Sequence, residues 1–150
     1  MAVKLSADEM RAWQGLLHAH EQLVRTLDAD LRERHGISFG AYDVLLRLAG
    51  AADGTLRMTE LAARVMLPPS SLTRRVDRLV ADGLLERSRS DRDSRLMLVR
   101  LTASGRGLVR RAAATHLRGI REHFTGRLSD HQLTALADAL EAITGPHEPH

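Results

Sequence analysis

One segment of this chain has two opposite faces when it is drawn as a helix, one cationic and one apolar. Ser71, Arg74, Arg75 and Arg78 lie at positions i, i+3, i+4 and i+7. Because these spacings place side chains on one side of a helix, they form a single polar, cationic stripe. The opposite side carries the apolar residues Leu72, Val76, Leu79 and Val80. The segment is therefore predicted to bury one face in a core and to expose three guanidinium groups.

Three guanidinium groups on one helix face have two interpretations. Guanidinium is a fork-shaped donor that suits phosphate oxygens and the O6/N7 edge of guanine. An ordinary solvated helix face has the same composition, so the stripe alone does not separate nucleic-acid binding from solubility. The neighbouring segments favour the first interpretation.

Short elements with their own sequence signals flank the cationic stripe. A short helix over residues 59–65, capped by Thr59, is predicted to end before the Leu-Pro-Pro turn at 67–69, which cannot lie inside a helix. Ser70 or Ser71 then caps the striped helix, and a glycine ends it. Two strand candidates follow, at residues 84–88 and 96–101, and they enclose a polar, charged tip. The order predicts a helix-turn-helix with a β-hairpin directly after it.

Longer amphipathic helices are predicted at both ends of the chain. The first spans residues 7–34, begins with a capping box at Ser6 and Glu9, and is ended by Gly36. The others are expected over residues 39–49 after a Ser38 cap, over residues 103–127 after a Thr102 cap, and from the Ser129–Gln132 capping box to Ile143. The apolar faces of the first and the last two of these helices need a partner, which a second copy of the chain would supply.

Charge and composition narrow the class of protein. Residues 57–111 hold 13 Arg and six acidic residues, a net charge of +7, whereas the rest of the chain carries −4. A basic middle between acidic ends is typical of a polyanion-binding protein. The chain has no Cys, which excludes disulfides and cysteine redox sensing and fits a cytoplasmic protein. No secretory signal or membrane span is expected.

These patterns predict a mostly α fold with a small β-hairpin wing: a winged helix-turn-helix plus terminal dimerisation helices. Residues 37–102 are expected to form the DNA-binding domain, residues 1–36 and 103–145 a helical dimerisation region, and residues 146–150 a disordered tail. The striped helix fits the major groove of double-stranded DNA, and a homodimer would read a pseudo-palindrome.

With this order of elements, the chain resembles the MarR family of bacterial transcriptional regulators. The residues that carry the resemblance are Leu61-Ala62, Ser70-Ser71-Leu72-Thr73-Arg74, Val76-Asp77-Arg78-Leu79, Gly83-Leu84-Leu85-Glu86-Arg87, Asp93-Ser94-Arg95 and Val99-Arg100-Leu101-Thr102-Ala103-Ser104-Gly105. The similarity covers nearly the whole chain, with the same order of helices. It implies a homodimeric winged-helix repressor, less often an activator, that a small ligand or an oxidant releases from DNA.

The resemblance extends to the wing. Its Asp-x-Arg pattern is matched by Asp93 and Arg95, which implies that the arginine enters the minor groove and that the aspartate helps to hold it. Many members carry another aspartate where this chain has Ser90, which leaves the role of Arg92 open. The alternative is a solvated hairpin loop.

The predicted DNA contacts divide by position. Arg74 and Arg75 lie early enough in the striped helix to reach base edges, and Arg78, one turn later, suits a phosphate. Arg87 and Arg89 either meet phosphates or serve solubility. Ser70 and Thr59 either cap helices or attract phosphate to a helix start, and both roles are compatible. The full predicted set is Ser70, Ser71, Thr73, Arg74, Arg75, Arg78, Arg87, Arg92, Asp93 and Arg95.

A small-ligand site is a further expectation. The resemblance implies an effector pocket between the dimer helices and the winged domain. Trp13, His20 and Tyr42 could hold a planar, anionic aromatic compound there, with Arg11 as counter-ion. The alternative, which the sequence favours, is that Trp13 and Tyr42 are core or dimer-interface residues.

Other chemistry has little support in the sequence. The eight His show no spacing typical of a metal site, although some members of the family bind zinc through His and Glu. No catalytic motif occurs, so neither an enzyme nor a cofactor is predicted. The competing function is a winged-helix module that docks a protein instead of DNA.

Overall fold

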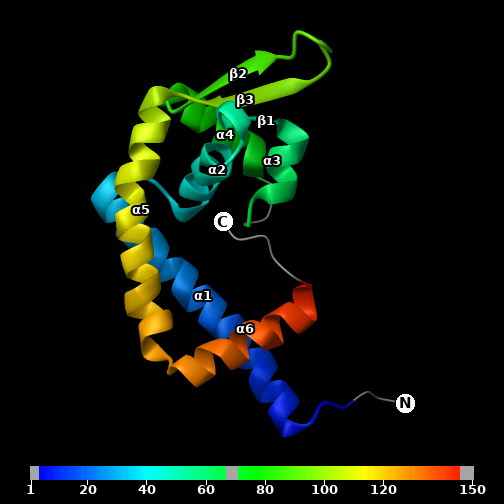
Figure 1. The fold of residues 1–150 in the computed structure, drawn as a ribbon, viewed down its shortest axis with the longest axis vertical. Coiled ribbons are helices and arrows are strands. Elements are labelled where there is room, and N and C mark those ends of the chain that lie inside the picture. Colours follow the sequence, from blue (N-terminus) through cyan, green and yellow to red (C-terminus); the bar gives the residue numbers. More distant parts are fainter. Residues whose placement is uncertain (1–3, 67–70, 146–150) are drawn as a thin grey trace.

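The structure is a computed structural model, and it describes residues 4–66 and 71–145. The α-helices are α1 (Ala7–His35), α2 (Phe39–Ala49), α3 (Met58–Arg64), α4 (Leu72–Ala81), α5 (Ala103–His123) and α6 (Asp130–Thr144). The strands are β1 (Thr55–Arg57), β2 (Leu85–Arg89) and β3 (Met97–Leu101), and two 3₁₀ turns are η1 (Ala52–Gly54) and η3 (Thr125–Arg127). Helices α2, α3 and α4 gather with the sheet at one end of the molecule, and α6 lies at the other end with much of α1 and α5 (Figure 1). The predicted fold class is confirmed.

Most of the longer helices begin where a side chain accepts a hydrogen bond from a backbone N–H of the first turn, as predicted. At the start of α1, the Ser6 backbone N–H donates to Glu9 Oε2 (2.6 Å) and the Glu9 N–H donates to Ser6 Oγ (3.2 Å). The bond from the Ser6 backbone N–H, with a smaller effect of the Ser6 side chain, holds the pKa of the Glu9 carboxyl below its usual range. Gly36 ends the helix with a φ of 69°, in the left-handed region that glycine tolerates. The caps at Ser38, Thr102 and Ser129 are also confirmed.

The wing belongs to a three-stranded antiparallel sheet, in the order β1-β3-β2. The predicted hairpin is confirmed, with each strand beginning one residue later than expected. Strand β1, whose Leu56 lies opposite Val99, was not predicted from the sequence. A strand of three residues shows too little alternation to be recognised, and its partner lies some forty residues further along the chain.

Three other details differ from expectation. Helix α3 begins at Met58, and its first turn is held by Glu60, which accepts from the Arg57 N–H (2.8 Å), so Thr59 is not its cap. Helix α5 ends at His123, four residues early, where the chain turns into η3. Ser71 occupies the N-cap position of α4 without a side-chain capping bond. The alternative cap Ser70, the turn at 67–69 and the predicted tail lie outside the described residues.

A continuous apolar core joins α2, α3, α4, α5 and the sheet. Its most buried members include Val44, Leu45, Leu48, Leu61, Val76, Leu85 and Val99. Because α4 contributes three buried residues to this core, packing on its apolar face fixes its orientation.

The start of α5 closes the winged unit. Thr102 donates its hydroxyl to the Gly83 carbonyl (2.8 Å) and its N–H to the Leu84 carbonyl (3.1 Å), which joins β3 to the turn after α4. Gly105, in the first turn of α5, is buried against the turn that follows α4. A Cβ at Gly105 would lie 2.2 Å from the Leu84 carbonyl oxygen and 2.7 Å from Leu101 Cδ1. Only glycine therefore allows this close approach.

Gly105→Ala is expected to destabilise the fold by about 1–3 kcal/mol, because backbone atoms must move to admit the methyl group. Gly107→Ala is the matched control, since its nearest neighbour is the mobile end of Arg111 at 3.3 Å. That control should be neutral or stabilising by up to about 1 kcal/mol. Urea unfolding measures both, and equal stability of the two variants would contradict this account of the contact.

The two long helices pack against each other near the winged unit and leave the other end of α1 uncovered. A Cβ at Gly119 of α5 would lie 2.7 Å from Leu27 of α1, and His35 hydrogen-bonds Thr115 (2.8 Å). The first half of α1 instead exposes Trp13 and its apolar neighbours. No helix in the described ranges is long and apolar enough to cross a membrane.

Candidate nucleic-acid interface

Helix α4 presents a cationic face directly opposite the face that anchors it. Leu72, Val76 and Leu79 are buried, while Arg74 and Arg78 are exposed. A helix clamped on one side can hold charged side chains at set positions on the other. Thr73, also predicted to contact DNA, is exposed on the same helix.

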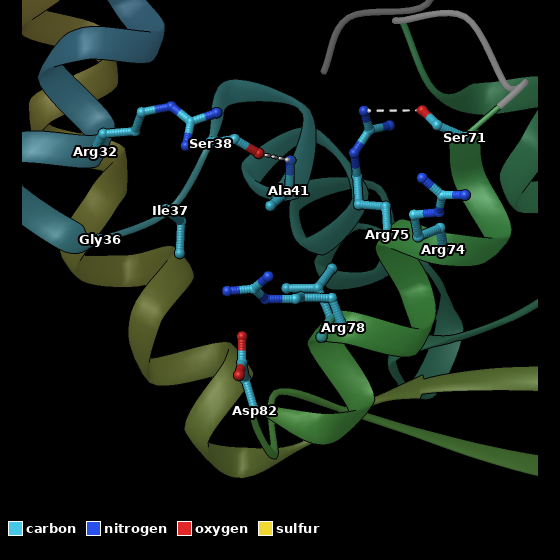
Figure 2. Close-up of a pocket in the computed structure, with 11 residues that line it drawn as sticks. Arg32, Gly36, Ile37, Ser38, Ala41, Ser71, Arg74, Arg75, Arg78 and Asp82 are labelled. Carbon is cyan, nitrogen blue, oxygen red and sulfur yellow. Dashed lines mark hydrogen bonds between the residues drawn. The ribbon is translucent and has the colours of Figure 1, made fainter.

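Arg75 lies differently from the other two arginines of the stripe. Its side chain is half-buried and turns toward α2, where its guanidinium atoms lie 2.8–3.0 Å from the position that a Cβ of Gly40 would take. Its Nη2 donates to Ser71 Oγ (3.3 Å) (Figure 2). Gly40 makes room for this arrangement because it has no side chain. Ser71 and Arg75 therefore contact each other at the edge of the stripe.

A hollow of about 390 Å³ separates α4 from the junction of α1 and α2. Figure 2 shows the α4 arginines along one side of it and Arg32 on the other. Its lining comprises Arg32, Gly36, Ile37, Ser38, Ala41, Ser71, Arg74, Arg75, Arg78, Leu79 and Asp82. The Asp28 carboxylate accepts a hydrogen bond from Arg32 Nε (2.6 Å). It also accepts one from the Phe39 backbone N–H (2.8 Å), which ties this arginine to the start of α2. Arg32, which was not predicted from the sequence, extends the cationic surface beyond α4.

The wing tip is held together by short-range hydrogen bonds that leave its cations exposed. Asp93 accepts the Arg95 backbone N–H (3.0 Å), and Ser90 Oγ accepts the Arg92 N–H (3.3 Å). Arg89 donates across the tip to the Ser94 carbonyl (3.2 Å). Ser90 thus makes a turn-stabilising contact. Asp93 orders the backbone of Arg95, and the side chains of Arg92 and Arg95 are exposed.

Arg87 lies beneath the surface that the other cations form. Its Nη1 forms an ion pair with Asp77 of α4 (2.7 Å), and its side chain is less than one-third exposed. Asp77, like Arg32, was not predicted from the sequence to be a functional residue. The one sequence signal for a structural role of Asp77 was its helical position, beside but not within the apolar stripe.

The three ligand-site candidates do not come together within one chain. Tyr42 is 2% exposed, and its ring lies 5.0 Å from that of His116, which also faces Phe39 at 5.7 Å. Burial raises the pKa of Tyr42. Trp13 and His20 are instead exposed on the first half of α1. A site built from all three needs a second chain.

His116 makes stability depend on pH. Burial lowers the pKa of His116 below its ordinary 6.5, with a smaller opposing effect of the Asp43 charge. Because the unfolded chain takes up the proton first, stability should fall as the pH drops below about 6.5. His116→Gln should reduce this loss between pH 7 and 5 in thermal unfolding, and His18→Gln, an exposed control, should not. Equal pH profiles for all three proteins would contradict the assignment.

No cluster of three or more His, Asp or Glu residues suited to a metal ion occurs within residues 4–66 and 71–145.

The chain is similar to known regulators over most of its length. The model of the MarR family matches residues 35–96, from the end of α1 to the wing tip. The HTH-type transcriptional repressor YetL of Bacillus subtilis (strain 168) is 27% identical over 112 residues, which are 73% of this chain and 67% of that protein. AbsC of Streptomyces coelicolor, a MarR family transcriptional regulator, is 29% identical with a TM-score of 0.87, covering 95% of this chain and 96% of its own. Sco3205 from the same organism, a MarR family transcriptional regulator solved in complex with DNA, is 29% identical with a TM-score of 0.89, covering 99% and 93%.

Proposed function

We propose that this chain, which resembles the MarR family of transcriptional regulators in sequence and fold, is a repressor that binds a pseudo-palindromic operator as a homodimer. In this proposal α4 enters the major groove, and the β2–β3 wing meets the adjacent minor groove or backbone. The observation that carries it is the exposed Arg74 and Arg78 face of α4, directly opposite three buried anchors. The Sco3205 complex supports the DNA partner by similarity.

The homodimer accounts for the uncovered apolar surface of the terminal helices. The α1 apolar face, defined as Met10, Trp13, Leu16 and Leu17, is 40–54% exposed. Leu117 of α5 and Ile143 of α6 are more exposed still. A surface of this kind favours a protein partner, and a second copy would present the same face across a two-fold axis. Two recognition helices then read two half-sites about one helical turn apart.

A small aromatic effector is the regulatory part of the proposal. Trp13 and His20 from one chain, meeting Tyr42 of the other, would give a planar ligand an aromatic and polar lining. Tyr42 is packed within the core, so a ligand that reached it would act on α2, which packs directly against α4. That contact offers a route from the ligand to the recognition helix.

Fluorescence anisotropy with a duplex from the region upstream of the protein's own gene tests the proposed function. A repressor of this kind should bind its specific site about 10³-fold or more tightly than a scrambled duplex of equal length. Equal affinity for the specific and scrambled duplexes would contradict sequence-specific regulation at that site.

A further inference from the structure

We propose that Asp77 and Arg87 form a strut that fixes the wing to α4, so that the two DNA-contacting elements meet DNA at one set angle. This inference rests on the proposed DNA binding and assigns a positioning role to both residues. Arg87 Nη1 lies 2.7 Å from Asp77 Oδ1, and the pair joins the middle of β2 to the middle of α4.

The alternation of β2 directs Arg87 inward. Leu85 and Arg87 share one face of the strand, and Leu85 is 1% exposed in the core. Arg87 lies opposite Val99 in the sheet, which is fully buried. Its Nε is also buried, without a hydrogen-bond partner among the described residues. The aliphatic part of the Arg87 side chain therefore covers the core, and its guanidinium pairs with Asp77 of α4.

Asp77 lies on the flank of α4 between the apolar face and the arginine face. It follows Val76 and precedes Arg78, and its side chain is 56% exposed. A carboxylate in this position repels phosphate and weakens the attraction of the neighbouring Arg78 for DNA. By charge alone, removing Asp77 should tighten DNA binding. If Asp77 is part of the strut, its removal should instead weaken DNA binding.

The angle between wing and helix decides which groove the wing reaches. The hairpin leaves α4 through a tight turn at Gly83, with a φ of 73°, and extends well beyond the helix (Figure 1). A small rotation at the base of such a lever displaces Arg92 and Arg95 at its tip by a larger distance. A bond between β2 and α4 limits that rotation before DNA arrives, which lowers the ordering cost of binding.

The test compares Asp77→Ala, Arg87→Ala and the double variant in anisotropy titrations with the specific duplex. Each single variant should bind about two- to tenfold more weakly, as expected for the loss of a contact between neighbouring residues. The double variant should be no weaker than the weaker single variant, because both changes remove the same strut. Asp77→Glu should restore binding. Glu86→Ala, which removes a carboxylate from the opposite face of β2, is the matched control and should not weaken binding.

Two further readouts separate a strut from a general loss of structure or a lost phosphate contact. Hydroxyl-radical footprints of Asp77→Ala should lose protection where the wing binds and keep it where α4 binds. The salt dependence of Arg87→Ala should keep its wild-type slope, whereas a lost phosphate contact lowers the slope by about 0.9. Unfolding midpoints show that each variant is folded.

The outcomes are distinct. Undiminished or tighter binding by Asp77→Ala, beside normal wild-type binding, overturns the strut alone. A reduced salt slope for Arg87→Ala with unchanged binding by Asp77→Ala assigns Arg87 to phosphate and also overturns it. Failure of the wild-type protein to bind any duplex overturns the proposed function, and the strut with it.

Discussion

Arg74→Ala is expected to weaken binding to the specific duplex by about 1–3 kcal/mol and to relax discrimination at one base pair. Arg74 is exposed in the first turns of α4, which is the part of a recognition helix that contacts base edges. The buried Leu72 and Val76 hold the backbone beneath it, so the guanidinium starts from a fixed position. Anisotropy titrations against duplexes substituted one base pair at a time measure both effects.

The matched control is Arg121→Ala, which removes the same charge from the far end of α5, where the side chain is exposed. It should change affinity little, because screening weakens charges beyond about 8–10 Å. Arg75→Ala should relax discrimination less than Arg74→Ala, because the Arg75 guanidinium lies over Gly40. The sequence-based expectation that Arg75 also reaches a base stays a prediction, and a larger loss of discrimination for Arg75→Ala would support it against the geometry described above.

Leu17→Asp is expected to separate the dimer and to weaken operator binding by about 10²–10⁴-fold. Leu17 belongs to the α1 apolar face and is 47% exposed in the single chain. A carboxylate there would be buried without a partner in the dimer, which is strongly unfavourable. Once the two recognition helices are no longer joined, each half-site is bound separately, and the gain from linking them is lost. Light scattering after size-exclusion chromatography gives the oligomeric state, and anisotropy gives the affinity.

His18→Asp is the control for this variant. His18 follows Leu17 directly, but the helical periodicity directs it away from the α1 apolar face. It should leave both the dimer and DNA binding in place. A wild-type protein that is already monomeric, or a Leu17→Asp variant that remains a fully active dimer, would contradict the proposed interface.

The features that local sequence determines could be predicted, and those that depend on distant contacts could not. Ser6, Ser38, Thr102 and Ser129 each cap a helix because their partners lie three residues away. Strand β1 has no such local signal, because it forms only against β3. The end of α5 at His123 is similarly set by how the chain turns toward α6, while the periodicity continues past it.

The candidate site shows the same division. Helical spacing correctly places the buried and polar faces of α4, because the period of a helix is fixed. Spacing does not give the direction of a long side chain after it leaves the helix. Arg75 turns toward Gly40, which is 35 positions away in the sequence. Arg87 turns toward Asp77, whose role as its partner has no signal in the spacing. Arg32 joins the site only because the fold places the end of α1 across the hollow from the cationic face of α4.

The central claim is that the cationic face of α4 and the wing bind DNA phosphates and bases. A salt titration of binding to the specific duplex tests it most directly, because each neutralised phosphate contributes about 0.9 to the slope of log affinity against log salt. With several cations from each of two chains in contact with DNA, we expect binding that weakens steeply, with a slope of at least about 4 in magnitude. A slope near zero, or no binding at low salt, would contradict the claim and favour a winged helix that docks a protein.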